Sequence, residues 1–227
     1  ARNPKAASAV TTIYEPPRAA QTDERPVVIG FGPGGMFAAL ALALAGLRPI
    51  VLERGQDAAA RHDAVRRFWE TGTLDPARNV QFGEGGAGTF SDGKLNTGVN
   101  DPRIQWILEQ FAAAGADESI LYDAKPHIGT DALLTVVQNL RRRILALGGE
   151  VRFSAQVTGF LRGDGALSGL EVCERGETYT LPCRHAILAI GHSARDTFET
   201  LLQSGVPMEP KAFSMGVRIE HRQEMVN

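Results

Sequence analysis

A glycine-rich turn between two short apolar runs constrains the fold of this chain more than any other feature. Residues 30–35, Gly-Phe-Gly-Pro-Gly-Gly, satisfy the pattern G-x-G-x-x-G. A β-branched run at 27–29 precedes the turn, an Ala/Leu-rich segment at 34–46 follows it, and a second apolar run comes at 50–52. This order predicts a strand, a tight turn, a helix and a second strand, which is the context that a dinucleotide-binding motif requires.

Each glycine of the turn has a physical role in such a motif. Gly30 makes the tight turn, Gly32 lets the backbone approach a pyrophosphate, and Gly35 allows the helix to pack closely on the strand. Pro33 and Gly34 fall in the first helical turn, where a proline loses no hydrogen bond and free N–H groups attract phosphate. Any glycine-rich loop can produce the same pattern, so the prediction depends on the elements around it.

Glu53 closes the second apolar run and supplies the acidic residue of the motif. It follows Gly35 by 18 residues, close to the roughly 20 expected for the carboxylate that accepts hydrogen bonds from ribose hydroxyls. A carboxylate at this place also repels a 2′-phosphate, so NADP is disfavoured. The pattern alone does not distinguish FAD from NAD.

The remaining elements predict an α/β fold. The two apolar runs do not alternate, as expected for strands of a parallel sheet with helices on both faces. We predict further helices at 102–114 and 131–147, the second capped by Thr130 or Asp131, and strands at 151–153 and 185–190. Turn residues at 163–165 and 175–176 divide 155–180 into an antiparallel β-meander. The predicted fold class is therefore a Rossmann-like domain with a parallel sheet and an added meander.

Two basic stretches are interpreted as solvated helix faces. In a surface helix at 57–71, helical spacing separates an apolar side from a basic side. The apolar side has Val65, Phe68 and Trp69, and the basic side has Arg61, Arg66 and Arg67. Arg141, Arg142 and Arg143 form a second such face in the helix at 131–147.

The sequence predicts three regions along the chain. Residues 1–26 hold four prolines and are expected to form an arm or linker, and residues 27–205 form the dinucleotide-binding domain. Residues 206–227 are expected to begin a second, truncated domain with a strand at 213–220. Because the chain starts without Met and stops at Asn227, soon after that run, we expect it to be part of a longer protein.

A second glycine-rich segment covers residues 83–98. Residues 88–95 match the phosphate-binding pattern G-x-x-x-x-G-K, but Leu95 replaces the hydroxyl that binds magnesium and no strand leads into the pattern. We therefore reject a nucleotide triphosphatase and expect a loop folded against a cofactor. Ser91 and Lys94 are its candidate polar contacts, and a cation at the pyrimidine edge would stabilise a reduced flavin. A solvated loop lysine is an equally good interpretation of Lys94.

Polar residues follow the strand predicted at 185–190. Ligands gather at the carboxyl ends of strands in open α/β sheets, so His192 and Arg195 are candidates to face a substrate. A hydrogen-bonded loop histidine is the more ordinary interpretation of His192.

Composition excludes several classes of function. The formal net charge of -2 has no dominant block, which gives no reason to expect nucleic acid or an anionic membrane. The longest apolar run, 36–47, is too short to cross a bilayer, and no signal peptide precedes it. Cys173 and Cys183 form no redox pair, and the histidines and cysteines have no metal-ligand spacing. A small-molecule partner and a reducing cytoplasm are expected.

Four stretches together resemble a bacterial family of uncharacterised FAD-dependent dehydrogenases, relatives of the glutathione-reductase-like flavoproteins. They are residues 27–55, GEGGAGTFSDGKL at 83–95, AIGHSARD at 189–196 and FSMGVRIEH at 213–221. The resemblance implies FAD, with Arg54 beside Glu53 at the ADP half and backbone contacts to adenine from Gln156 and Val157. It also places Gly191 over the cofactor and the loop at 83–95, with Gly85, Gly86 and Ala87, toward the flavin. The family's late Gly-Asp segment has no counterpart before Asn227.

These observations favour an FAD-dependent oxidoreductase that passes hydride through flavin N5, with NAD(P)H as a candidate electron donor. Two alternatives stay open. The first is an NAD-dependent dehydrogenase without flavin. The second is an FAD-binding protein with a structural or RNA-modification support role and no dehydrogenase turnover.

Overall fold

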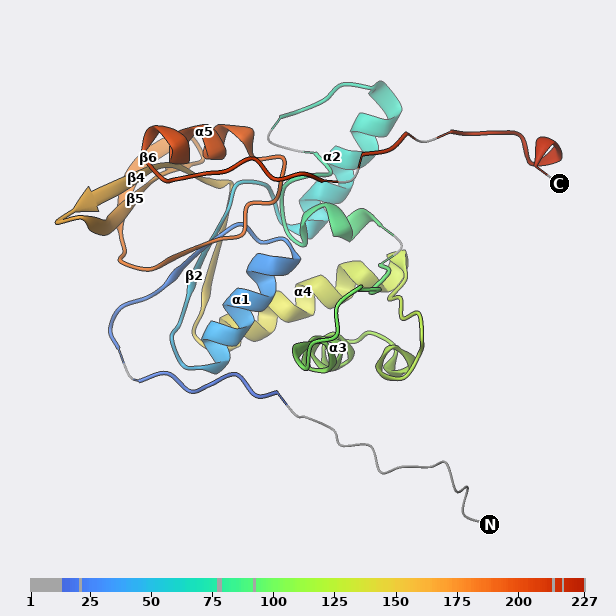
Figure 1. The fold of residues 1–227 in the computed structure, drawn as a ribbon, viewed down its shortest axis with the longest axis horizontal. Helices are drawn as coiled ribbons and strands as arrows, with labels where there is room; N and C mark the ends of the chain where they lie inside the picture. The colour runs from blue at the N-terminus through green and yellow to red at the C-terminus, as the bar shows by residue number, and fades with distance from the viewer. Residues whose placement is uncertain are drawn as a thin grey trace, which may run out of the picture.

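A four-stranded parallel sheet forms the centre of the molecule (Figure 1). The structure, a computed structural model, describes residues 14–20, 22–76, 79–91, 93–213, 215–217 and 219–226. The strand order is β3-β2-β1-β7. The bounds are β1 (Val27–Ile29), β2 (Ile50–Glu53), β3 (Glu150–Phe153) and β7 (Ala186–Leu188). All neighbours pair in parallel, which confirms the predicted sheet.

An antiparallel meander forms the second sheet. It consists of β4 (Ala155–Gly163), β5 (Ala166–Glu174) and β6 (Glu177–Pro182) in sequence order. Both connections are two-residue turns with positive φ at each residue: Asp164 and Gly165, then Arg175 and Gly176. Such turns match the twist of a hairpin, so the local sequence is enough to predict them.

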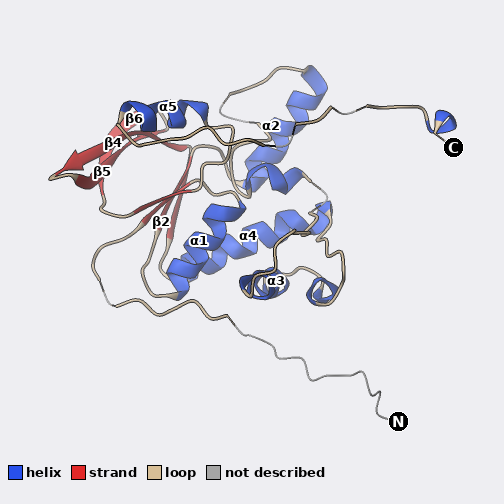
Figure 2. Ribbon diagram, in the orientation of Figure 1, coloured by secondary structure: helices blue, strands red, loops and turns tan. Residues whose placement is uncertain are grey.

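The parallel sheet lies between helices and the meander (Figure 2). Val28 and Val51 pack into a core with the helices α1 (Pro33–Leu44) and α4 (Thr130–Ala146). Val27, Ile29 and Leu52 pack on the other side, against apolar residues of β4 and β5. The expectation of helices on both faces is therefore wrong for one face. The meander has an apolar face of its own and can bury the sheet as well as a helix would.

The remaining helices are α2 (Ala58–Thr71), α3 (Arg103–Ala113) and α5 (Arg195–Gln203), with 3-10 turns η1 (Gly86–Phe90), η2 (Glu118–Leu121) and η3 (Gln223–Met225). The bounds of α2, α3 and α4 agree with the predicted helices to within one residue. Asp57 caps α2 by accepting from the N–H groups of Ala59 and Ala60. The predicted cap of α4 is wrong, because Gly129 holds the N-cap position and Thr130 is already helical. The sequence analysis did not predict α5.

The predicted faces of α2 are wrong in one important respect. Arg61, assigned to the solvated side, is buried at 1% exposure, while Trp69, assigned to the apolar side, is 67% exposed. Arg61 can be buried because backbone carbonyls from a distant loop accept hydrogen bonds from its guanidinium. Helical spacing carries no information about such partners.

Arg141 is a second correction. Its Nε lies 3.3 Å from Oε1 of the buried Glu84, and its guanidinium stacks over the ring of Phe153 at 5.3 Å. Arg143 donates to Gln110 over 2.6 Å. The interpretation of residues 141–143 as a solvated face is therefore wrong for Arg141, which reaches into the interior.

The two ends of the described chain lack regular strands. In the predicted arm, residues 1–13 lie outside the described residues, and Tyr14 packs edge-on against Trp106 with ring centroids 5.8 Å apart. The described residues between 213 and 220 form no strand, and the predicted strand is not observed there. A strand needs a neighbour for its hydrogen bonds, and no described strand pairs with this segment.

The division of the chain at residues 26 and 205 stays a prediction. No described helix has the length and apolar character to span a membrane.

Candidate functional site

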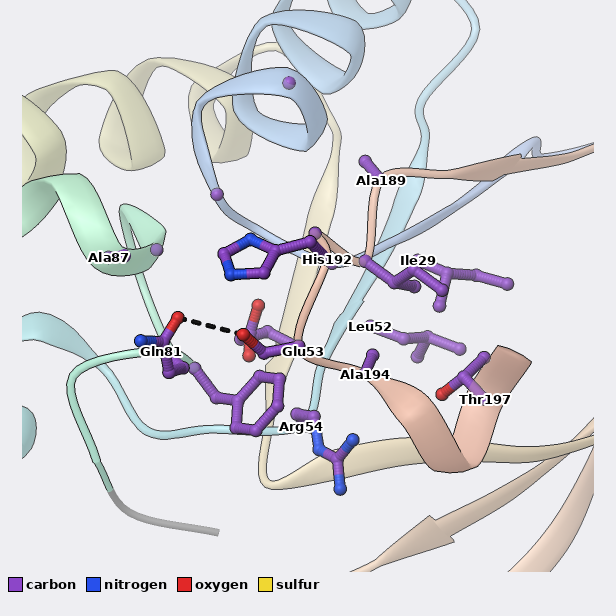
Figure 3. Close-up of a pocket in the computed structure, with 18 of the residues that line it drawn as sticks. Ile29, Leu52, Glu53, Arg54, Gln81, Ala87, Ala189, His192, Ala194 and Thr197 are labelled. Atoms are coloured by element: carbon purple, nitrogen blue, oxygen red, sulfur yellow. Dashed lines mark hydrogen bonds between the residues drawn. The ribbon is translucent and has the colours of Figure 1, made fainter. Parts of the chain in front are cut away.

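A cavity of about 410 Å³ opens where β1, β2 and β7 end. Its volume is within the roughly 300–1,000 Å³ typical of small-molecule sites. Figure 3 shows Ile29, Leu52 and Ala189 at the strand ends, with Gln81 and Ala87 coming from the second glycine-rich segment and the residues just before it. A larger hollow of about 730 Å³ lies at the amino ends of β1 and β7, but its lining includes no glycine. The first cavity is therefore the candidate site.

The turn at residues 30–35 forms one wall and needs glycine for two different reasons. Gly30 has φ +99°, and a Cβ on it would collide with the carbonyl oxygen of Ala189. A Cβ on Gly35 would collide with the carbonyl oxygen of Gly30. The fold itself therefore requires these two glycines, which do the turning and packing that the motif predicts.

Gly32 is different, because no described protein atom excludes a side chain there. Its φ is -71°, and the nearest atom to a Cβ would be Cα of Gly86 at 3.7 Å. Gly32 nevertheless lines the cavity. A Cβ at this position would occupy space that a ligand could use, as expected where the backbone approaches a pyrophosphate.

The amino end of α1 faces the same cavity. Pro33 and Gly34 line it, no described side chain caps the helix, and no acidic residue lies in the first turn. The first N–H groups of a helix have no partner inside it and carry the positive end of the helix dipole. This wall of the cavity suits an anion such as a pyrophosphate.

Glu53 is held rigidly beside the turn. It is 4% exposed, and its Oε1 accepts from the backbone N–H groups of Gly55 and Gly83, each over 2.8 Å. Its Oε2 accepts from the N–H of Phe31 over 2.7 Å. A carboxylate can accept about four hydrogen bonds. One acceptor site is therefore left for a ligand hydroxyl, and Glu53 lines the cavity where a ribose would lie.

Arg54 also lines the cavity and is tied to Asp196. Its Nη1 and Nη2 donate to the two carboxylate oxygens of Asp196 over 2.8 and 2.9 Å. The guanidinium stacks on the ring of Phe82 at 4.3 Å. Gln156 donates to the same carboxylate over 2.9 Å. Because Arg54 stabilises the charged form, the pKa of Asp196 lies below its ordinary value, and the carboxylate is ionised at neutral pH.

Buried charges hold the second glycine-rich segment against the cavity. Arg61 donates to the carbonyl oxygens of Glu84, Gly86 and Val80, the last two over 2.9 and 3.1 Å. The Glu84 carboxylate accepts from the N–H of Ala58 over 2.8 Å. Burial lowers the pKa of Arg61 to about 10, so the guanidinium stays charged at neutral pH. The same loss of water raises the pKa of Glu84.

The structure brings most of the candidate residues named from sequence to the cavity. The ones that line it are Gly30, Gly32, Pro33, Gly34, Glu53, Arg54, Gly86, Ala87, Val157, Gly191 and His192. In Figure 3 the His192 ring extends across the cavity toward Ala87. Gly35, Gly85, Ser91, Lys94 and Arg195 are not part of the lining.

Ser91 and Lys94, the candidate polar contacts to a cofactor, lie outside the lining of the cavity. Ser91 donates to the carbonyl oxygen of Gly88 over 2.7 Å and accepts from the N–H of Gly93. Lys94 is exposed and pairs with His127 in an isolated β-bridge. Sequence reasoning missed Gln81, Phe82, Asp196 and Thr197, which form part of the lining or hold Arg54. Asp196 was visible only as the last residue of AIGHSARD, with nothing to link it to Arg54.

Over the part of the chain that the structure describes, no group of three or more His, Cys, Asp or Glu side chains could hold a metal ion.

Comparison with known proteins supports the fold. No family model matches the sequence. An uncharacterised protein of Clostridium beijerinckii is 51% identical over 203 residues, which cover 89% of this chain and 37% of that protein. The chain thus spans little more than a third of the length of this relative. The crystal structure of THI4 from Thermovibrio ammonificans is similar with a TM-score of 0.51 and 14% identity, covering 81% of this chain and 64% of that one.

A second solved structure is less similar. It is a geranylgeranyl bacteriochlorophyll reductase-like protein from Thermoplasma acidophilum, with a TM-score of 0.44 and 17% identity over 74% of this chain and 39% of that one. At these identities the likeness to THI4 concerns the fold, a Rossmann-like α/β domain with an added antiparallel sheet, in agreement with the predicted fold class.

Proposed function

We propose that the cavity binds the ADP half of FAD and that this chain is the cofactor-binding part of a flavin-dependent oxidoreductase. The observation that carries the proposal is Gly32, whose missing side chain no protein contact explains. Beside it lie an uncapped helix end for a pyrophosphate and a buried carboxylate with one acceptor site for a ribose hydroxyl. Gln156 and Val157, which also line the cavity, are the wall on which adenine would lie.

Each group of the chain has a stated role in this proposal. The N–H groups at the start of α1 bind the pyrophosphate, and Glu53 orients the ribose. Gly86, Ala87 and Gly191 line the cavity and limit the entry of water, while the loop beyond them extends toward the flavin. When bound, flavin supplies a two-electron centre that accepts and donates hydride. An NAD(P)H donor, a small-molecule substrate and a cytoplasmic location complete the proposal.

The three candidate catalytic residues differ in their position relative to the cavity. Of the three candidates, only His192 lines the cavity, and it does so beside the pyrophosphate wall. Lys94 and Arg195 could act only on parts of the flavin or substrate that extend beyond it. We therefore propose His192 as a group that contacts the cofactor and assign no proton-transfer step to it.

The visible absorption spectrum of the intact protein tests the cofactor, with any chromophore released by heat and identified by mass. We expect flavin bands and released FAD. Gly32→Val should reduce the flavin content about tenfold or more, because its side chain displaces the pyrophosphate, whereas its Cβ comes no closer than 3.7 Å to a described protein atom. Glu53→Gln should reduce it less. Gly98→Val is the matched control, since Gly98 also has open space around it but lies outside the cavity.

Other outcomes would favour the alternatives. Unchanged flavin content in Gly32→Val and Glu53→Gln would contradict the proposed site. A colourless protein that binds NADH and cannot be reconstituted with FAD would support the NAD-dependent dehydrogenase. Bound FAD that no pyridine nucleotide reduces would support a structural role or one in RNA modification.

A further inference from the structure

The end of β2 presents two residues with opposite preferences for the ribose. In dinucleotide-binding folds, an acidic residue at this place binds a free 2′-hydroxyl, whereas a nearby arginine accommodates a 2′-phosphate. Here Glu53 and Arg54 are neighbours, and both line the cavity. The preference of the site therefore depends on whether the Arg54 guanidinium is available to a ligand.

The fork that the two Nη groups of Arg54 form is occupied, because Asp196 accepts one hydrogen bond from each of them. The two bonds of 2.8 and 2.9 Å form the bidentate geometry in which guanidinium and carboxylate bind most strongly. The Phe82 ring packs on the guanidinium at 4.3 Å and keeps its plane in place. A 2′-phosphate would have to displace the carboxylate before it could use the same fork.

Asp196 is itself fixed in position. Gln156 donates to its Oδ2, and the N–H of Thr197 donates to its Oδ1, each over 2.9 Å. It lies in the first turn of α5, where the helix dipole favours a negative charge. Three side chains, from the residue after β2, from β4 and from α5, are thus hydrogen-bonded to one another at the ribose end of the cavity.

We propose that Asp196 is a specificity-determining residue that masks Arg54 and so excludes dinucleotides carrying a 2′-phosphate. The Asp196 carboxylate also repels a phosphate dianion that approaches Arg54. In Asp196→Asn this repulsion is removed, and one acceptor oxygen replaces two, so the fork is no longer held at both Nη groups. The inference rests on the proposed binding of an adenine dinucleotide and identifies which dinucleotides the site selects.

Isothermal titration of the intact protein, freed of bound nucleotide, with ADP-ribose and with 2′-phospho-ADP-ribose tests the inference. The two probes differ only in the phosphate. The wild type should prefer ADP-ribose, and Asp196→Asn should shift the ratio of the two dissociation constants about tenfold toward the 2′-phosphate. Glu199→Gln is the matched control, since it removes one negative charge from the same helix at an exposed position, and should leave the ratio unchanged.

Two further variants separate masking from a general effect on stability. Arg54→Ala combined with Asp196→Asn should abolish the shift, because no guanidinium is left to bind the phosphate. Arg54→Lys should shift the ratio in the same direction as Asp196→Asn, because a single ammonium cannot hold both carboxylate oxygens. Arg54→Lys also tests the inference if Asp196→Asn does not fold.

The possible failures are distinguishable. A wild type that binds neither probe contradicts the proposed function and the inference with it. A wild type that binds ADP-ribose, with a ratio that Asp196→Asn and Arg54→Lys leave unchanged, contradicts the inference alone. An equal shift in Glu199→Gln would show a long-range charge effect and would overturn the role of Asp196.

Discussion

The two glycine-rich segments of this chain meet at one cavity but are held by different forces. The turn at 30–35 is shaped by its own backbone and by the ends of β1 and β7, and its glycines avoid collisions with Gly30 and Ala189. The segment at 83–98 is held by the buried Arg61 of α2 and the partly buried Arg141 of α4, together with its own buried Glu84. The conformation of a glycine-rich loop can therefore be predicted from local sequence only where the residues that confine it belong to the adjoining strands and helix.

The difference has a consequence for how each segment responds to substitution. The first should fail when a backbone collision is introduced, and charge acts on it through Phe31, whose N–H donates to Glu53. The second should fail when a buried charge is removed and should depend on pH.

The largest expected effect is that of Gly35→Val. Its side chain would collide with the carbonyl oxygen of Gly30, a backbone atom that cannot move without disrupting β1 and α1. We expect the free energy of unfolding to fall by about 3 kcal/mol or more, the upper range for overpacking. Chemical denaturation measures it, with Gly98→Val as the control. A loss below about 1 kcal/mol would show that the turn is not held by this contact.

The next largest is that of Arg61→Met, which retains the length of the side chain but removes the charge. It leaves Glu84 buried without one of its compensating cations and leaves three carbonyl oxygens with one donor fewer. A buried carbonyl oxygen left without its donor costs about 1–3 kcal/mol, so we expect the free energy of unfolding to fall by about 3 kcal/mol. Arg66→Met on the exposed side of α2 should cost less than about 0.5 kcal/mol.

Amide hydrogen exchange in Arg61→Met can show which of the two glycine-rich segments opens. In Arg61→Met the N–H groups of Gly85 and Gly86, which donate to Phe31 and Gly83, should lose protection, while Met36 should keep it. Equal loss at both places would mean that the two glycine-rich segments open together as a single cooperative unit.

The smallest effect is a pH dependence that comes from Glu84. Because burial raises its pKa in the folded state above the unfolded value, the folded protein binds this proton more tightly. The corresponding stability is present below the unfolded pKa and is lost as the pH rises through the folded pKa.

The free energy of unfolding of the wild type should therefore fall relative to that of Glu84→Gln as the pH is raised above about 4.5, the ordinary glutamate value. Glu70→Gln, at an exposed position on α2, should show no such trend. A difference that instead grows with pH would mean that Arg61 and Arg141 outweigh the cost of burial.

Much of the fold could be predicted because its signals are short in range. The hairpin turns at Asp164 and Arg175, the cap at Asp57 and the turn at 30–35 each depend on a few consecutive residues. Two features of the fold were not predicted: the packing of the meander on one face of the parallel sheet, and the helix α5. An apolar run does not indicate which surface it will pack against.

The residues of the site can likewise be divided into those that the sequence predicted and those that it did not. Sequence by itself determined the turn, the helix end behind it and the carboxylate of Glu53, because backbone geometry and spacing along one strand–helix–strand unit require them. Only the tertiary structure decided that Asp196 binds Arg54, 142 positions away, and that Arg61 lies buried under a loop. A charged side chain can be buried only where hydrogen-bond partners from distant segments surround it. Those partners come together only when the chain has folded.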